Sequence, residues 1–326
     1  MINNRLVWYL ENNKILSKYQ SGFRKRRSTS DHLVRLDTFI RESFIQKQHV
    51  ISVFFDLEKA YDTTWKHGIM KDLHDAGLRG HLPLFIKSFL TNRSFRVRVD
   101  NTYSNVCCQE MGVPQGSILS ATLFSLKINS IVKCLLPGIE CSLYVDDFVI
   151  SYASQLLGTA ERHMQQCLNS LQRWSDSNGF KFSPNKTVCV HFCRQRRLHP
   201  DPTLLLRGHR IPVVDETKFL GLIFDKKLNY KSHIMKIKTE CTKALNLLIF
   251  LCNTDWGADR KVLLRLYRSL IRSKLDYGSI VYGETFKSYA NMLDPIHNKG
   301  LRICLGAFRS SPVDSYMWRQ TSLHYT

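Results

Sequence analysis

Two stretches, VISVFFD at residues 50–56 and CSLYVDD at residues 141–147, share one pattern: an apolar run that ends on one or two aspartates. Each run has the length and the β-branched and aromatic content of a buried strand. Asp56, Asp146 and Asp147 therefore lie where predicted strands stop. A carboxylate buried beside such runs is costly unless a cation or hydrogen bonds compensate it. We expect a divalent cation, and oxygen ligands of this kind suit Mg²⁺.

Each acidic position also has a simpler interpretation. Asp146 and Asp147 stand between two apolar segments, and Asp tolerates turn conformations, so this pair by itself could be a hairpin turn. Asp56 by itself could be an exposed strand end. The segment between the two positions makes these simpler interpretations less attractive.

That segment contains MGVPQGSILS, residues 111–120, a loop that opens a predicted helix. Gly112 and Gly116 flank Pro114, which fixes one backbone angle and gives a defined turn that a ligand can approach. The helix carries apolar residues at helical spacing. A glycine-bearing helix start is weak evidence for phosphate or base contact when taken alone.

Taken together, three segments resemble the palm motifs of reverse transcriptases in order, spacing and context: FFDLEKAYD (54–62), GVPQGS (112–117) and YVDD (144–147). The details resemble the non-LTR branch, LINE-type and particularly the jockey-like elements of arthropods. YQSGFR (19–24) resembles a fingers motif, and the tail segments LDYG (275–278) and LDPIHN (293–298) resemble that branch as well.

The resemblance implies an α+β right-hand polymerase fold. Residues 1–225 would form partial fingers and a palm with an antiparallel sheet, and residues 226–326 a mostly helical thumb. Related elements carry a further basic fingers segment that would precede Met1, so the fingers are expected to be incomplete. The rest of the element's polyprotein, including an endonuclease, would be a partner.

The resemblance also implies the chemistry: RNA-directed DNA polymerisation from an RNA template, a DNA primer or target DNA, and dNTPs. Asp56 and Asp146 would bridge two Mg²⁺ ions, with Asp147 as a third ligand. Lys186 would assist the leaving pyrophosphate, and Asp62 would hold local structure. The remaining site residues would be Tyr61 as a steric gate against ribonucleotides, Gly112, Gln115 and Gly116 at the nucleotide, and Phe219, Leu220 and Gly221 as a primer grip.

The net charge of +20, from 47 Lys and Arg against 27 Asp and Glu in 326 residues, independently predicts a polyanionic partner. Neither a signal peptide nor a run of about 20 apolar residues that could span a membrane is recognisable. We expect an intracellular protein, in the nucleus or the cytoplasm, with no membrane partner. Basic groups expected to face the phosphate backbone are residues 24–27, residues 194–197, and a stripe at Lys261, Arg265, Arg268 and Arg272.

Ten cysteines are present without any Cys-x-x-Cys spacing. We therefore expect free thiols that behave as small apolar side chains. A zinc site at Cys189, His191 and Cys193, which alternate on a predicted strand, is the alternative.

Apolar periodicity predicts helices over residues 31–46 and 159–177, and strands over 180–182 and 188–192. Strands and helices alternate in the centre of the chain, which suggests a sheet covered by helices on one face.

Other classes stay open. A degenerate or domesticated remnant would bind nucleic acid without polymerase activity. A group II intron-type or telomerase-like polymerase would share the palm chemistry but carry a different tail. A phosphate-metabolising enzyme with paired acids would explain neither the charge nor the loop at Gly116.

Overall fold

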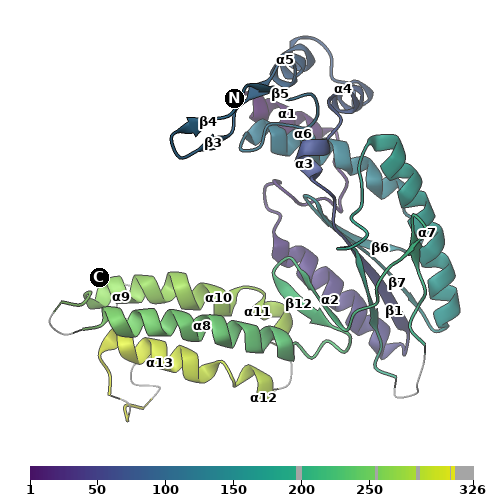
Figure 1. The fold of residues 1–326 in the computed structure, drawn as a ribbon. Coiled ribbons are helices and arrows are strands. Elements are labelled where there is room, and N and C mark those ends of the chain that lie inside the picture. Colours follow the sequence, from purple (N-terminus) through teal and green to yellow (C-terminus); the bar gives the residue numbers. More distant parts are fainter. Residues whose placement is uncertain (196–199, 254–255, 284–286, 309, 313–326) are drawn as a thin grey trace. The chain divides into compact units, whose positions relative to one another are not determined.

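A computed structural model describes residues 1–195, 200–253, 256–283, 287–308 and 310–312. The chain divides into two compact units, Met1–Leu220 and Gly221–Thr326 (Figure 1).

The centre of the first unit is a four-stranded antiparallel sheet in the order β6-β7-β1-β8. Its strands are β1 (His49–Phe55), β6 (Glu140–Tyr144), β7 (Asp147–Ser154) and β8 (Val188–Phe192). All seven residues of β1 are buried, which requires cover on both faces of the sheet.

Helices supply that cover from two sides (Figure 1). The helix α7 (Leu157–Asn178) packs its apolar stripe on Ile51, Val53 and Phe55 of β1. The helix α2 (Thr29–Ile45) contacts β6, β7 and β1 from the other side. The expectation of helices on one face only was wrong, because side chains alternate along β1 and both sets are apolar.

The helices predicted over residues 31–46 and 159–177 are confirmed as α2 and α7, and the residues at their ends explain where they begin and end. Ser28 and Asp31 form a capping box at the start of α2. Gly179, with φ of 75°, ends α7 in the left-handed conformation that glycine adopts without strain.

The strand predicted at residues 188–192 is confirmed as β8, but residues 180–182 do not form a regular strand. Phe182 makes an isolated antiparallel bridge with Leu57, while Phe180 lies in the core and stacks on Trp174. The alternating pattern that predicted a strand instead places two phenylalanines in the core.

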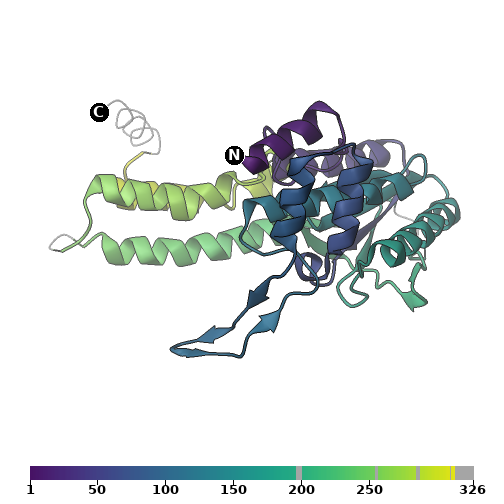
Figure 2. The same cartoon turned by 90° about the horizontal axis from the view of Figure 1, so that it is seen from above.

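A second apolar core in this unit gathers the remaining helices and buries Leu6, Leu73, Ile86 and Leu123. These helices are α1 (Ile2–Asn12), α3 (Ala60–Thr63), α4 (Lys66–Asp75), α5 (His81–Leu90) and α6 (Ile118–Ile128), which a 3₁₀ turn (Asn129–Cys134) follows. Short strands complete the unit: β2 (Ser94–Phe95) with β5 (Cys107–Cys108), β3 (Arg98–Val99) with β4 (Thr102–Tyr103), β9 (Leu205–Leu206) with β10 (His209–Arg210), and β11 (Glu216–Phe219). Figure 2 shows residues 94–108 as a long two-stranded arm.

The second unit is mostly helical after β12 (Leu222–Asp225). Its helices are α8 (Lys231–Leu251), α9 (Arg260–Tyr267), a π-helical turn (Arg268–Arg272), α10 (Ser273–Asp276), α11 (Ser279–Tyr282), α12 (Lys287–Ala290) and α13 (Asp294–Leu305). The helices α8, α9 and α13 pack on one another. Among the described residues, none of the helices combines the length and the apolar character that crossing a bilayer requires.

Candidate active site

Asp56 is placed by the chain segment that follows β1. The segment is held by the backbone of residues 181–183: the Glu58 N–H donates to the Lys181 carbonyl at 2.9 Å, and the Ser183 N–H donates to the Asp56 carbonyl at 2.8 Å. The Asp56 side chain stays 39% exposed. The Lys186 Nζ lies 3.5 Å from its Oδ2, so the predicted lysine does reach the first acid.

Asp146 and Asp147 lie at a hairpin turn, so the turn and the acidic site are the same place. Tyr144 pairs with Asp147, which leaves Val145 and Asp146 as a two-residue turn between β6 and β7. Val145 has φ of 61°, a left-handed conformation that a β-branched residue rarely adopts. Both aspartates are exposed, which corrects the premise that these acids are buried.

A buried glutamine holds this strained turn. Gln20 is 0% exposed, and its Oε1 accepts the N–H of Val145 at 3.1 Å and that of Gly22 at 2.8 Å. A Cβ on Gly22 would lie 2.4 Å from Val145 Cγ2, so only glycine fits there. The segment that resembles a fingers motif therefore packs directly against the turn at Asp146. Sequence reasoning had singled out this segment but missed the role of Gln20.

The sheet register brings the two acidic positions together. Phe55 pairs with Phe148, so Asp56 and Asp147 lie one residue beyond the same rung of β1 and β7. Although part of Asp147 is exposed, desolvation of its carboxyl group by the surrounding protein, and then the charges of Asp146 and Asp56, raise its pKa to about 6, while Lys218 opposes the shift. Desolvation disfavours the charged carboxylate, and the neighbouring like charges add to the shift.

A pocket of about 490 Å³ in the first unit gathers the predicted nucleotide residues. Tyr61, Gln115 and Gly116 line it, together with Phe23 and Asn3, which sequence reasoning missed. The Tyr61 ring stacks on Phe124 with centroids 4.5 Å apart. Burial, and then the charge of Asp146, raises the pKa of Tyr61 to about 12, which keeps its hydroxyl neutral and places the tyrosine within reach of the acids.

Gly112 and Asp62 support the pocket from behind. A Cβ on Gly112 would lie 2.6 Å from the Asp62 carbonyl oxygen, and the Gly112 N–H donates to the Thr64 carbonyl at 2.9 Å. The Gln115 Nε2 donates to Asp62 Oδ1 at 2.9 Å. Gly112 does not line the 490 Å³ pocket and instead sets the distance between the loop and α3.

The predicted primer-grip residues differ in exposure. Phe219 is 4% exposed and packs edge-on against Phe54, so its side chain belongs to the core. Leu220 has φ of 44° and is half-buried. In the second unit, Gly221 has φ of 89°, and a Cβ there would lie 2.9 Å from the Tyr277 ring.

The predicted basic surfaces are only partly available. Arg24 forms hydrogen bonds of 2.6 Å to both carboxyl oxygens of Glu11, so its charge is already paired within the protein. In the second unit Lys261 and Arg265 are exposed and Arg268 is half-buried. Arg272 pairs with Asp276 at 2.8 Å, so its charge is already partly neutralised within the protein. Arg196 and Arg197 lie outside the described residues.

Comparisons with known proteins agree with this geometry. Residues 1–224 match the family model described as reverse transcriptase (RNA-dependent DNA polymerase). The chain is 29% identical, over 99% of its length, to a probable RNA-directed DNA polymerase from transposon BS of Drosophila melanogaster. It covers 36% of that protein. It is 28% identical, over 94% of its length, to the RNA-directed DNA polymerase from mobile element jockey of the same organism, and covers 34% of it.

The chain thus spans about a third of the length of these relatives. Among solved structures, telomerase from Candida albicans in complex with a fragment of telomeric RNA matches 98% of this chain with a TM-score of 0.52 at 15% identity, and the match covers 58% of that protein. This likeness shows the right-hand polymerase fold. With the family model matching residues 1–224, the chain belongs to the reverse transcriptase (RNA-dependent DNA polymerase) family.

Proposed function

We propose that this chain is the polymerase portion of a non-LTR retrotransposon protein and extends a DNA primer on an RNA template. The observation that carries the proposal is the meeting of Asp56, Asp146 and Asp147 at one end of the sheet. The similarity to the BS and jockey polymerases supports it. Residues 1–225 would act as fingers and palm, and residues 226–326 as the thumb.

The residues present fit Mg²⁺. Carboxylate oxygens are the ligands that this ion prefers, and the sheet register sets Asp56 opposite Asp147 with Asp146 beside it in the turn. Asp56 and Asp146 would hold two ions, with Asp147 as an additional ligand. When bound, the ions would stabilise the charge that develops on the attacking and leaving oxygens.

The side chains around the acids would bind and orient the reactants. The primer 3′-hydroxyl attacks the α-phosphate of a dNTP, and pyrophosphate leaves. The Tyr61 ring, held by Phe124, would leave no room for a ribose 2′-hydroxyl. Gln115, held by Asp62, would contact the nucleotide from the adjoining loop. Lys186 would supply positive charge or a proton near the leaving pyrophosphate.

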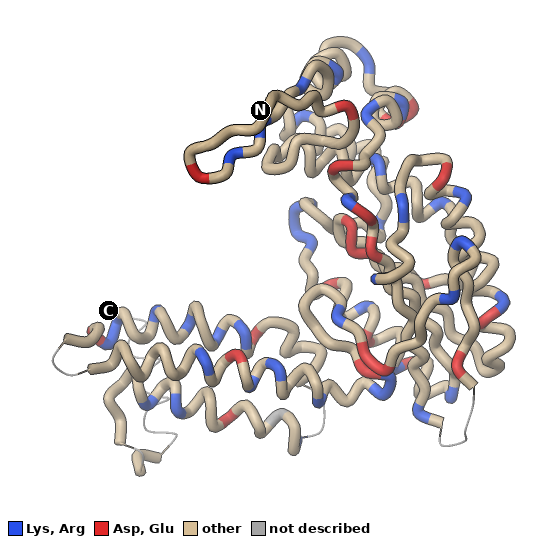
Figure 3. Tube along the Cα trace, viewed as in Figure 1, with Lys and Arg blue, Asp and Glu red and all other residues tan. Residues whose placement is uncertain are grey.

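The basic surface supports nucleic-acid binding independently of turnover. Figure 3 shows Lys and Arg along the helices of both units, consistent with the net charge of +20. That charge alone would also suit a remnant that binds nucleic acid without extending it. The acid set is the feature that argues for an enzyme.

Primer extension separates the two functions. The full chain would be incubated with a defined RNA template, an annealed DNA primer, dNTPs and Mg²⁺, and binding would be followed in parallel by filter retention. We expect extension that EDTA abolishes while binding remains. A chain that binds the primed template and adds no nucleotide in Mg²⁺ or Mn²⁺ would support the remnant and overturn the polymerase proposal.

A further inference from the structure

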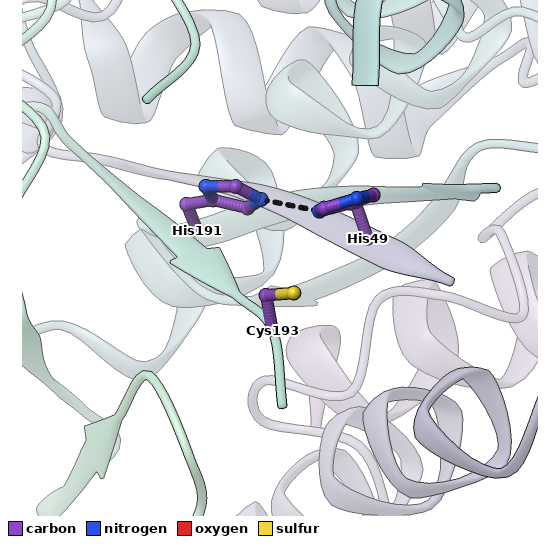
Figure 4. A group of neighbouring side chains, drawn as sticks. All are labelled: His49, His191 and Cys193. Atoms are coloured by element: carbon purple, nitrogen blue, oxygen red, sulfur yellow. Dashed lines mark hydrogen bonds between the residues drawn. The ribbon is translucent and has the colours of Figure 1, made fainter. Parts of the chain in front are cut away.

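A second group of potential metal ligands lies at the opposite end of the sheet from Asp56. The ligand atoms of His49, His191 and Cys193 all lie within 4.8 Å of one another (Figure 4). The three residues are 6%, 4% and 7% exposed. His49 opens β1 seven positions before Asp56, which at about 3.3 Å per residue is roughly 23 Å away along the strand. This group is therefore separate from the proposed polymerase site.

The pairing of β1 with β8 brings these residues together. Ile51 pairs with His191 and Val50 with Phe192, so continuing the antiparallel register sets His49 opposite Cys193. Opposed residues share a face of the sheet, as do residues two apart along one strand. His49, His191 and Cys193 consequently converge on one face.

The two imidazoles already face each other. The His49 Nδ1 and the His191 Nε2 lie 3.0 Å apart and share one hydrogen bond. Two nitrogens bound tetrahedrally to zinc at about 2.05 Å would lie about 3.3 Å apart, and a nitrogen and a thiolate sulfur about 3.6 Å apart. The separation of the two nitrogens needs to grow by about 0.3 Å, and the sulfur needs to approach by about 1.2 Å at most.

Surrounding groups orient the histidine and the thiol as metal sites require. The His191 Nδ1 lies 3.3 Å from Asp201 Oδ1, which fixes the ring and leaves Nε2 turned toward His49. A carboxylate on the outer ring nitrogen is the usual companion of a zinc-bound histidine. The Gln195 N–H donates to Cys193 Sγ at 3.3 Å, which fixes the position of the sulfur, and the Gln195 side chain donates to the Lys47 carbonyl at 2.9 Å.

We infer that His49, His191 and Cys193 bind a zinc ion that fastens the start of β1 to the end of β8. Two imidazoles and one thiolate are ligands for zinc and not for Mg²⁺. Water would complete the tetrahedron. The site lies far from the polymerase acids and would tie together two strands of the central sheet.

The structure also revises the alternative considered from the sequence. Cys189, the first member of that predicted site, is buried on the same face of β8 but lies outside the group, opposite Val53. His49 takes its place. A metal-free histidine pair beside a buried thiol is the competing explanation, and it predicts no metal uptake.

Metal content and cobalt spectroscopy test the inference without relying on polymerase activity. The full chain, purified after growth with zinc, should carry stoichiometric zinc. Replacement by Co²⁺ should give the visible bands of a tetrahedral ion and a thiolate-to-cobalt charge-transfer band. Removing zinc with a chelator should lower the thermal midpoint by about 5–10 °C, as expected for a ligand present at about 100 times its Kd.

Variants assign the ligands. Cys193→Ser should lose the charge-transfer band and His49→Gln should lose stoichiometric zinc, whereas Cys189→Ser, a matched buried cysteine on the same strand, should keep both. Asp201→Asn should weaken zinc binding by about 10–100-fold, because Asp201 only positions His191. A wild-type chain that takes up neither zinc nor Co²⁺ would overturn the inference. So would loss of the charge-transfer band in Cys189→Ser with its retention in Cys193→Ser.

Discussion

At the scale of single residues, substitution of Asp146 tests the proposed chemistry most directly. Asp146→Asn keeps the size of the side chain and removes the charge that would hold a metal ion. We expect primer extension to fall by at least about 100-fold, because loss of a metal ligand removes stabilisation of the reacting oxygens. Steady-state incorporation on a primed RNA template measures it.

Asp75→Asn is the matched control, since Asp75 is an exposed acid at the end of α4. It should extend primers like the wild type. Activity of Asp146→Asn within about tenfold of the wild type would remove Asp146 from the proposed metal site.

The steric gate proposed at Tyr61 predicts how sugar selection changes on substitution. Tyr61→Ala opens the space that the ring fills against Phe124, so rNTPs should be admitted. We expect the ratio of dNTP to rNTP incorporation to fall by at least about tenfold, roughly 1.4 kcal/mol in the transition state. Tyr61→Phe keeps the ring and should keep the ratio. An unchanged ratio in Tyr61→Ala would show that another group excludes the 2′-hydroxyl.

His32 gives the first unit a pH-dependent stability. It is 2% exposed, and neither ring nitrogen has a hydrogen-bond partner among the described residues. Burial, and then the charge of Arg35, lowers the pKa of His32 to about 4. The folded protein therefore binds fewer protons than the unfolded chain between pH 6.5 and 4, and stability is lost as the pH falls through this window.

The loss attributable to His32 should reach up to about 3 kcal/mol at pH 4, at about 1.4 kcal/mol per pKa unit. Urea unfolding at pH 7, 5.5 and 4.5 measures it. His32→Leu should flatten this part of the profile, whereas His209→Gln, at an exposed histidine, should leave it unchanged. Equal pH dependence in wild type and His32→Leu would contradict the assignment.

At the scale of elements, the segment around Gln20 couples the helical part of the first unit to the acid-bearing hairpin. The backbone of residues 19–21 forms two hydrogen bonds with Leu143 of β6. The Ser21 N–H donates to the Leu143 carbonyl at 3.1 Å, and the Leu143 N–H donates to the Tyr19 carbonyl at 3.3 Å. The segment thus extends the sheet at its β6 edge. Through these bonds and the Gln20 contact with Val145, the segment holds the turn that carries Asp146.

Gly22→Ala tests that coupling. The added methyl group would lie 2.4 Å from Val145 Cγ2 and 2.7 Å from Val145 N, so the turn must shift. We expect destabilisation by about 1–3 kcal/mol, as for other overpacked sites, and a decrease in primer extension larger than the decrease in folded protein explains. Denaturant unfolding and extension by the folded fraction measure the two effects.

Gly158→Ala is the control, because no atom lies within 4 Å of a Cβ at that position in α7. It should leave both stability and extension near the wild type. If Gly22→Ala behaves the same way, the turn at Val145 does not depend on this contact.

Element prediction succeeded where one face of a helix or strand carries the signal, as in α2, α7 and β8. It failed at Phe180–Phe182, because two alternating phenylalanines satisfy a strand pattern and a core-anchored loop equally well. The spacing of apolar residues indicates which side chains are buried. Burial alone does not decide whether the backbone pairs with another strand.

At the scale of the whole molecule, the charge of +20 predicts strongly salt-dependent binding. Each phosphate that a Lys or Arg neutralises releases counterions, so affinity for a primed RNA template should fall by at least about 100-fold between 50 and 200 mM salt. Filter binding across that range measures it. A nearly flat dependence would contradict phosphate binding as the role of the basic surface.

The stripe in the second unit refines the measurement. Changing both Lys261 and Arg265 to Gln should reduce the salt slope by about 2, because each of these side chains would neutralise one phosphate. Arg272→Gln is the control from the same stripe, since Arg272 is already paired with Asp276 and should change the slope less. An equal change in salt slope per substituted residue would show that the pairing of Arg272 with Asp276 does not affect phosphate binding.

The sequence by itself determined the local features: two strands that end on acids, the glycine loop between them, the long helices and the excess of positive charge. These depend on side chains close together along the chain. Only the tertiary structure decided that Lys186 reaches Asp56, that Gln20 holds Val145, and that His49 and not Cys189 joins His191 and Cys193. Such meetings depend on strand register and on packing between segments as much as 144 positions apart, which local spacing does not encode.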